Sequence, residues 1–149
     1  RWRAMLIHAS AAALGSEAVL VRGPSGAGKS DLVLRLMTRG WQLVADDQVM
    51  IEGTQLAAPP ALRGMLEIRG LGIFEALPVA PCARLCLVVD LVPRADVPRL
   101  PEPAFWQGPA GAVPRIALHA FDDSICEKIT YALAAASGRL RQKTGAFAA

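Results

Sequence analysis

The fold is decided by one stretch of the sequence, Gly23-Pro24-Ser25-Gly26-Ala27-Gly28-Lys29-Ser30. It has the pattern G-x-x-x-x-G-K-S of a phosphate-binding loop. Glycines let the backbone turn tightly, so that several N–H groups converge on one phosphate, and the helix that follows adds partial positive charge there. The stretch therefore predicts an ATP site in which Lys29 reaches the β- and γ-phosphates and the Ser30 hydroxyl holds Mg²⁺.

The sequence on both sides of the loop has the strand–loop–helix order that this motif requires. Residues 18–21 form a continuous apolar run, which is typical of a central strand. Apolar residues recur at helical spacing through residues 32–37, and Gly40 stands where a helix C-cap is expected. The order predicts an α/β fold, a P-loop nucleotide-binding domain with a central mixed sheet flanked by helices.

Further runs complete the expected elements. Short apolar runs predict strands at residues 5–8, 43–45, 49–51, 85–89 and 116–119. Residues 66–74, which glycines interrupt, predict strand and turn, whereas the density of proline and glycine in residues 93–114 predicts a long surface loop. A last helix is predicted to begin at Asp122 and Asp123, and Arg139, Arg141 and Lys143 are expected to complement the dipole at its C-terminal end.

Length and composition predict one globular domain over residues 1–149. The chain is 53% hydrophobic and 19% charged, and it has no apolar run long enough to cross a bilayer. Its three cysteines are an odd number without metal-ligand spacing. We therefore expect a cytoplasmic protein with no membrane partner. The net charge of +3 comes from scattered arginines, and no basic run with interleaved aromatic residues predicts a nucleic-acid partner.

A phosphoryl-transfer site also needs carboxylates at a strand end beside the loop, one for the metal and one to accept a proton. Two places in the sequence qualify. The doublet Asp46-Asp47 follows the run at residues 43–45, and Asp90 follows the run at residues 85–89. The residue pattern alone leaves both open, although two adjacent carboxylates can serve two tasks.

Three segments together resemble the C-terminal catalytic domain of HPr kinase/phosphorylase, the bifunctional enzyme of the bacterial phosphotransferase system. They are the loop, Leu-Val-Ala-Asp-Asp-Gln-Val at residues 43–49, and Leu-Glu-Ile-Arg-Gly-Leu-Gly-Ile at residues 66–73, in the family's order. The resemblance covers roughly residues 8–135, and the last segment is its specific part. It implies a PEP carboxykinase-like P-loop fold. It also implies an ATP-dependent protein serine kinase that phosphorylates an HPr-like phosphocarrier, and that reverses the reaction with phosphate to give pyrophosphate.

The resemblance implies roles for single residues as well. The expected catalytic set is Asp46, His8, Lys29 and Arg99. In this set Asp46 is the base in the kinase direction and the acid in reverse, and His8 is its partner. The expected metal ligands are Ser30, Asp47 and Glu67. Arg69 is expected to line the site, and Arg115 is a further basic candidate.

The sequence departs from the family pattern in two ways. The N-terminal domain common in the family is not part of this sequence, and Phe121-Asp122-Asp123-Ser124 replaces a glycine-arginine-asparagine turn. In the family that turn contacts neighbouring subunits and the carrier. Its replacement here leaves open both the expected homo-oligomer and the dephosphorylating activity. Two other functions fit the same loop: a small-molecule kinase, and a regulatory nucleotide-binding module without chemistry.

Overall fold

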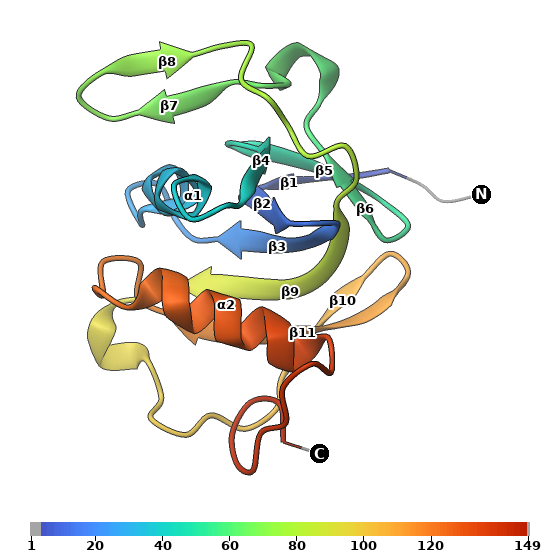
Figure 1. Ribbon diagram of the computed structural model, residues 1–149, viewed down its shortest axis with the longest axis vertical. Helices are drawn as coiled ribbons and strands as arrows, with labels where there is room; N and C mark the ends of the chain where they lie inside the picture. Colours follow the sequence, from blue (N-terminus) through green and yellow to red (C-terminus); the bar gives the residue numbers. More distant parts are fainter. Residues whose placement is uncertain (1–3, 149) are drawn as a thin grey trace.

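The computed structural model describes residues 4–148, and residues 1–3 and 149 lie outside this range. Within it, nine strands form one mixed sheet, and two more form a separate hairpin (Figure 1). The large sheet contains β1 (Met5–His8), β2 (Ser10–Leu14), β3 (Glu17–Arg22), β4 (Gln42–Ala45), β5 (Gln48–Glu52), β6 (Gln55–Ala57), β9 (Arg84–Leu91), β10 (Phe105–Gly108) and β11 (Gly111–Leu118). The hairpin consists of β7 (Leu66–Ile68) and β8 (Gly72–Phe74), and the α-helices are α1 (Lys29–Met37) and α2 (Ile125–Ala136).

The centre of the sheet is the parallel pair β3 and β9, with β2 beyond β3 and β4 at the edge. Both strands of the pair were predicted as apolar runs, and both are buried on their two faces. Along β3, Val19 and Val21 face the core that contains both helices, whereas Ala18 and Leu20 face a second core. This alternation is the ordinary period of a strand.

Both α-helices cover the same face of the sheet. Leu32 and Leu36 of α1 and Ile129 and Leu133 of α2 belong to one core cluster with the β3 and β9 side chains. The second face is packed by strands instead, through Val49 and Ile51 of β5 and through the β10–β11 hairpin. The expectation of a mixed sheet is confirmed, but the described helices flank it on one side only.

The segment at residues 93–114 is only in part the predicted loop, because half of its residues lie in regular elements. It contains a short 3-10 helix, η2 (Arg94–Asp96), then β10 and the start of β11, which pair as an antiparallel hairpin. The rest of β11 lies parallel to β9, with Ile116 beside Val89. Residues 97–104 form a stretch without regular structure, and residues 109–110 are the turn of the hairpin.

The two predicted helices are present, with different ends. The cap of α1 is Thr38, and Gly40 follows in a left-handed conformation at φ 88°. Helix α2 starts at Ile125 rather than at the aspartates, and its last turn holds no basic residue. Arg139 instead pairs with Glu17 at the start of β3, with 2.7 Å between Nη1 and Oε1.

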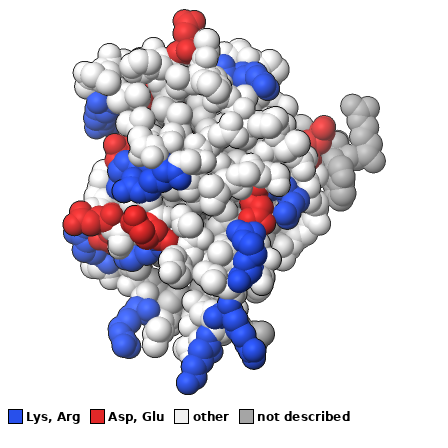
Figure 2. Space-filling view, viewed as in Figure 1, with Lys and Arg blue, Asp and Glu red and all other residues white. Residues whose placement is uncertain are grey.

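Over residues 4–148, neither helix has the length and apolarity that a membrane span requires. The face shown in Figure 2 carries basic and acidic side chains side by side, with long basic side chains projecting near the C-terminal end. This scatter matches the sequence expectation that the positive charge is not gathered into one run.

Candidate active site

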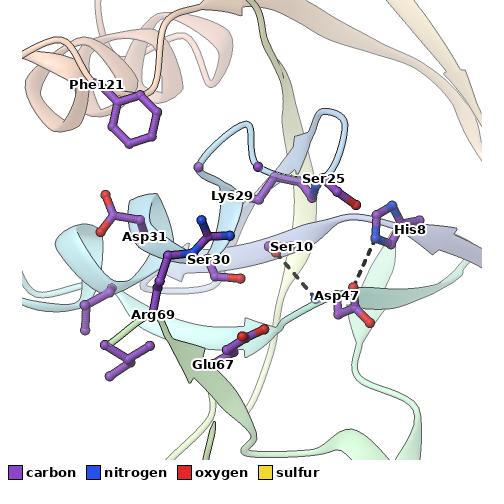
Figure 3. A pocket seen from close by; sticks show the side chains of 14 residues that line it. His8, Ser10, Ser25, Lys29, Ser30, Asp31, Asp47, Glu67, Arg69 and Phe121 are labelled. Atoms are coloured by element: carbon purple, nitrogen blue, oxygen red, sulfur yellow. Dashed lines mark hydrogen bonds and ion pairs between the residues drawn. The ribbon is translucent and has the colours of Figure 1, made fainter. Parts of the chain in front are cut away.

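The direction of the strands brings the loop and the aspartate doublet to one edge of the sheet. Strands β3 and β4 both lie antiparallel to β2, so their C-terminal ends point the same way. The loop follows β3, Asp46-Asp47 follows β4, and the start of β2 lies between them (Figure 3). Two segments that the sequence separates are therefore neighbours in space.

The loop has the backbone of a phosphate cradle. Gly26 and Gly28 have φ of 83° and 98°, a left-handed region that residues with a Cβ rarely adopt. Gly28 is also the N-cap of α1, and no side chain caps the helix there. The first N–H groups of the helix are thus available to an anion. The Lys29 Nζ donates hydrogen bonds to the carbonyls of Gly23 and Pro24, at 2.6 and 3.1 Å.

Asp46 is buried, with 8% of it exposed, and it is not among the described residues that line the pocket of this site, although Ser10, Ser30 and Glu67 beside it are. Its Oδ1 accepts hydrogen bonds from the hydroxyls of Ser30 and Ser10, at 2.6 and 2.8 Å. The backbone N–H of Glu67 donates to its other oxygen at 3.3 Å. This carboxylate therefore joins three segments: the loop, β2 and the β7–β8 hairpin.

Asp47 points the other way and binds His8. Its Oδ1 lies 3.0 Å from the His8 Nε2, and both side chains are more than half exposed. The prediction that His8 partners Asp46 is therefore wrong. The reason is the register of β1 on β5, which places His8 opposite Gln48, next to Asp47. Asp47 has φ of 71°, and this turn directs its side chain outward while Asp46 faces the sheet.

A pocket of about 370 Å³ opens between these groups. Glu67 and Arg69 reach it from the β7–β8 hairpin, and Phe121 closes its opposite end (Figure 3). Sequence reasoning did not single out Ser10 or Phe121 for this pocket. The signal for Ser10 was its position two residues after His8, because alternate residues of an extended chain share a face. The approach of Phe121 depends on the packing of α2 and had no local signal.

Arg99, Asp90 and Arg115 lie away from this pocket. Arg99 is exposed on residues 97–104 and is not among the lining residues that the structure describes. Asp90 receives two hydrogen bonds from Arg22, at 2.8 and 3.0 Å, and its carboxylate lies 3.7 Å from Arg115. Arg22 and Asp90 are register partners on β3 and β9, and Arg22 stacks under Trp106, so this cluster belongs to the second face. The carboxylates beside the loop are those of the doublet.

The described residues contain no group of three or more His, Cys, Asp and Glu side chains that could hold a metal ion. The oxygens near the loop are nevertheless of the kind that Mg²⁺ prefers. The Ser30 hydroxyl and the Glu67 carboxylate line the same pocket. Mg²⁺ is commonly bound by one or two protein oxygens together with phosphate oxygens and water. The donor set fits a metal that arrives with a nucleotide.

A family model, curated relatives and a solved structure all connect this chain to HPr kinases. Residues 3–92 match the family described as the HPr Serine kinase C-terminal domain. The chain is 48% identical over 88 residues to the HPr kinase/phosphorylase of Bordetella petrii, and 48% identical over 84 residues to that of Geobacillus thermodenitrificans. These matches cover 50% and 49% of this chain but only 28% and 27% of the relatives, so the chain spans under a third of their length.

A solved structure extends the similarity to most of the chain. The HPr(Ser) kinase/phosphatase from Coxiella burnetii matches with a TM-score of 0.70 and 26% sequence identity, over 87% of both chains. That fold contains a P-loop, in agreement with the strand–loop–helix order found here. The family match covers more than half of the sequence and includes the loop, the aspartate doublet and the hairpin. The chain therefore belongs to the family of the HPr Serine kinase C-terminal domain.

Proposed function

We propose that residues 1–149 form a single catalytic domain that transfers the γ-phosphoryl group of ATP to a serine hydroxyl of an HPr-like phosphocarrier. The observation that carries this proposal is the position of Asp46, whose carboxylate accepts hydrogen bonds from two seryl hydroxyls beside the phosphate loop. The names of the relatives support the same substrate class. The assignment to a PEP carboxykinase-like nucleotide-binding fold is part of this proposal.

The loop, residues 23–30, would hold the phosphates of ATP. Its left-handed glycines and the uncapped start of α1 supply N–H donors, and Lys29 is buried against the loop carbonyls. Phosphate oxygens carry more negative charge than these carbonyls and are stronger acceptors for the Lys29 ammonium. Ser30 and Glu67 would hold Mg²⁺, which neutralises charge on the phosphates when bound. Asp47 lines the same pocket and has one carboxylate oxygen paired with His8, so its role as a further metal ligand stays a prediction.

Asp46 would act as the base. A serine oxygen of the carrier bonds to the γ-phosphorus, the bond from that phosphorus to the leaving ADP oxygen breaks, and the serine proton passes to Asp46. Ser10 and Ser30 already donate to this carboxylate, so it is oriented to accept from the same type of group. The exposed pair His8 and Asp47 would border the incoming carrier. In the reverse direction Asp46 would return the proton. Arg99 has no role in this scheme, since it is exposed on residues 97–104 and, unlike Asp46, has no hydrogen bond to a described residue that lines the pocket.

The test is a transfer assay with the purified chain, Mg-ATP and an HPr-type carrier, read as phosphoserine by mass spectrometry. We expect the wild type to label the carrier. Asp46→Asn should reduce the rate at least about a hundredfold, because it keeps the shape but not the basicity of the side chain. Asp96→Asn is the matched control, because Asp96 is an exposed carboxylate on η2 away from the pocket.

The outcomes separate the rival functions. No labelled carrier together with turnover of a metabolite would favour a small-molecule kinase. Tight ATP binding with no transfer to any acceptor would favour a regulatory module. Labelling by Asp46→Asn at the wild-type rate would remove Asp46 from the role of base.

A further inference from the structure

The pocket has a second end, opposite to the His8–Asp47 pair, and the role argued for it rests on the proposed function. In phosphoryl transfer the attacking and the leaving oxygens lie roughly in line through the γ-phosphorus. The acceptor and the nucleoside therefore leave the phosphate loop in opposite directions. Figure 3 shows His8 and Asp47 on one side of Lys29 and Phe121 on the other. If the carrier approaches at the His8 end, the nucleoside lies at the Phe121 end.

The Phe121 ring is exposed and lies directly against the loop. Its side chain is 53% exposed and lines the pocket together with Leu34 of α1. A Cβ placed on Gly28 would lie 2.9 Å from the Cζ of Phe121, so the ring borders the last loop residue before the helix. A planar apolar surface thus begins at the point where the loop ends.

The backbone on both sides of Phe121 is anchored, although the ring itself is open to solvent. The carbonyl of Ala120, on one side, accepts a hydrogen bond from the Arg35 guanidinium of α1. On the other side, the Asp122 carboxylate accepts from Arg94 at 2.8 Å and from Lys128 at 3.4 Å. The segment that carries the ring is therefore anchored before any ligand arrives, which lowers the entropic cost of binding to it.

We propose that Phe121 is a nucleobase-stacking residue and that residues 119–124 form the nucleoside end of the ATP site. Stacking of a base on an aromatic side chain adds affinity and discriminates weakly between bases, because every base has a π face. The residue would thus select nucleotides over bare polyphosphates, while GTP and ATP would bind with similar affinity.

Isothermal titration calorimetry of the full chain with Mg²⁺, using ATP and inorganic tripolyphosphate as separate probes, tests this assignment. We expect the wild type to bind ATP more tightly than tripolyphosphate. Phe121→Ala should weaken ATP binding about tenfold and change tripolyphosphate binding by less than about twofold. Phe121→Trp, which keeps an aromatic ring at this position, should bind ATP about as tightly as the wild type does. The matched control is Phe105→Ala on β10, which removes a phenylalanine that is 59% exposed and is not among the pocket-lining residues described.

Four outcomes would contradict the assignment of Phe121. ATP affinity unchanged in Phe121→Ala, or equal losses for both probes, would overturn the stacking assignment, since equal losses mean that the loop itself is disturbed. A wild type that binds tripolyphosphate as tightly as ATP would overturn it as well, and would leave the proposed phosphate site standing. A wild type that binds neither probe would overturn the proposed function and this inference together.

Discussion

The backbone at Asp47 explains how two adjacent carboxylates face different ways. Asp47 has φ of 71°, a left-handed conformation that costs a residue with a Cβ about 1–2 kcal/mol. Asparagine and aspartate tolerate it better than alanine, because their short polar side chains bond to nearby backbone groups. This strained residue follows the buried Asp46 and precedes strand β5. Its conformation lets the Asp46 side chain face Ser30 of the loop while the Asp47 side chain faces His8. Backbone strain of this kind is concentrated at functional sites.

Substitution at position 47 separates this backbone effect from the loss of charge. We expect Asp47→Asn to unfold in urea with nearly the wild-type free energy, since the exposed pair with His8 contributes little. Asp47→Ala should be about 1 kcal/mol less stable than Asp47→Asn, and Asp47→Gly should not be. Equal stabilities for the alanine and asparagine variants would show that the left-handed turn is not under strain.

Elements built from continuous apolar runs could be predicted from the sequence, whereas those that depend on a distant partner could not. The runs in β3, β4 and β9 and the spacing in α1 are local signals, and all four elements are present. The β10–β11 hairpin was missed because proline and glycine dominate residues 93–114. Proline and glycine are compatible with this hairpin because of where they lie. Gly108 and Gly111 stand on either side of the turn, and Pro114 pairs with Phe105 in a hairpin at the outside of the sheet.

The candidate site shows the same division. The loop and the doublet are contiguous motifs, so their residues could be chosen from the sequence. The side on which each aspartate lies depends on one φ angle and on the register of β1 with β5, which no local pattern encodes. Ser10 lies in a stretch of small residues where its position two residues after His8 is the one local signal, and the pairing of β2 with β4 brings it to Asp46.

The missed hairpin also makes a testable contribution to stability. Trp106 of β10 packs on the second core, and its ring lies 5.6 Å from the Arg22 guanidinium. Trp106→Ala should lower the free energy of unfolding by about 2 kcal/mol, because it removes an aromatic ring from a partly buried site. Phe105→Ala, one residue away and 59% exposed, should change it by less than about 0.5 kcal/mol. Similar losses in thermal or urea unfolding for both variants would contradict the packing described.

At the scale of the whole molecule, β3 joins the candidate site to a second charged cluster. The phosphate loop follows the last residue of β3, and Glu17 begins the strand at the far end. There Arg139 and Arg84 lie 2.7 and 3.6 Å from the Glu17 carboxylate. Arg139 comes after α2, so this ion pair fastens the end of the chain to the central sheet. It lies away from the pocket and should affect folding rather than chemistry.

This cluster predicts how stability depends on pH. Burial opposes ionisation of Glu17, but hydrogen bonding to Arg139 and the charges of Arg139 and Arg84 outweigh it, so the pKa of Glu17 falls below its ordinary value of 4.5. A lowered pKa in the folded state stabilises the protein fully above the unfolded value, and this contribution is lost as the pH falls through the folded value. Because Arg139 is about half exposed, solvent screening limits the contribution to about 1 kcal/mol.

Glu17→Gln should therefore lower the free energy of unfolding by about 1 kcal/mol at pH 7, as measured by urea titration monitored by circular dichroism. The difference from the wild type should shrink as the pH falls below about 4.5 and the wild-type carboxyl takes up its proton. Glu102→Gln, in the exposed segment at residues 97–104, removes the same charge as a control and should show no such dependence. A loss that stays constant from neutral to acidic pH would mean that Glu17 acts through packing, and that its ion pairs with Arg139 and Arg84 contribute no stability.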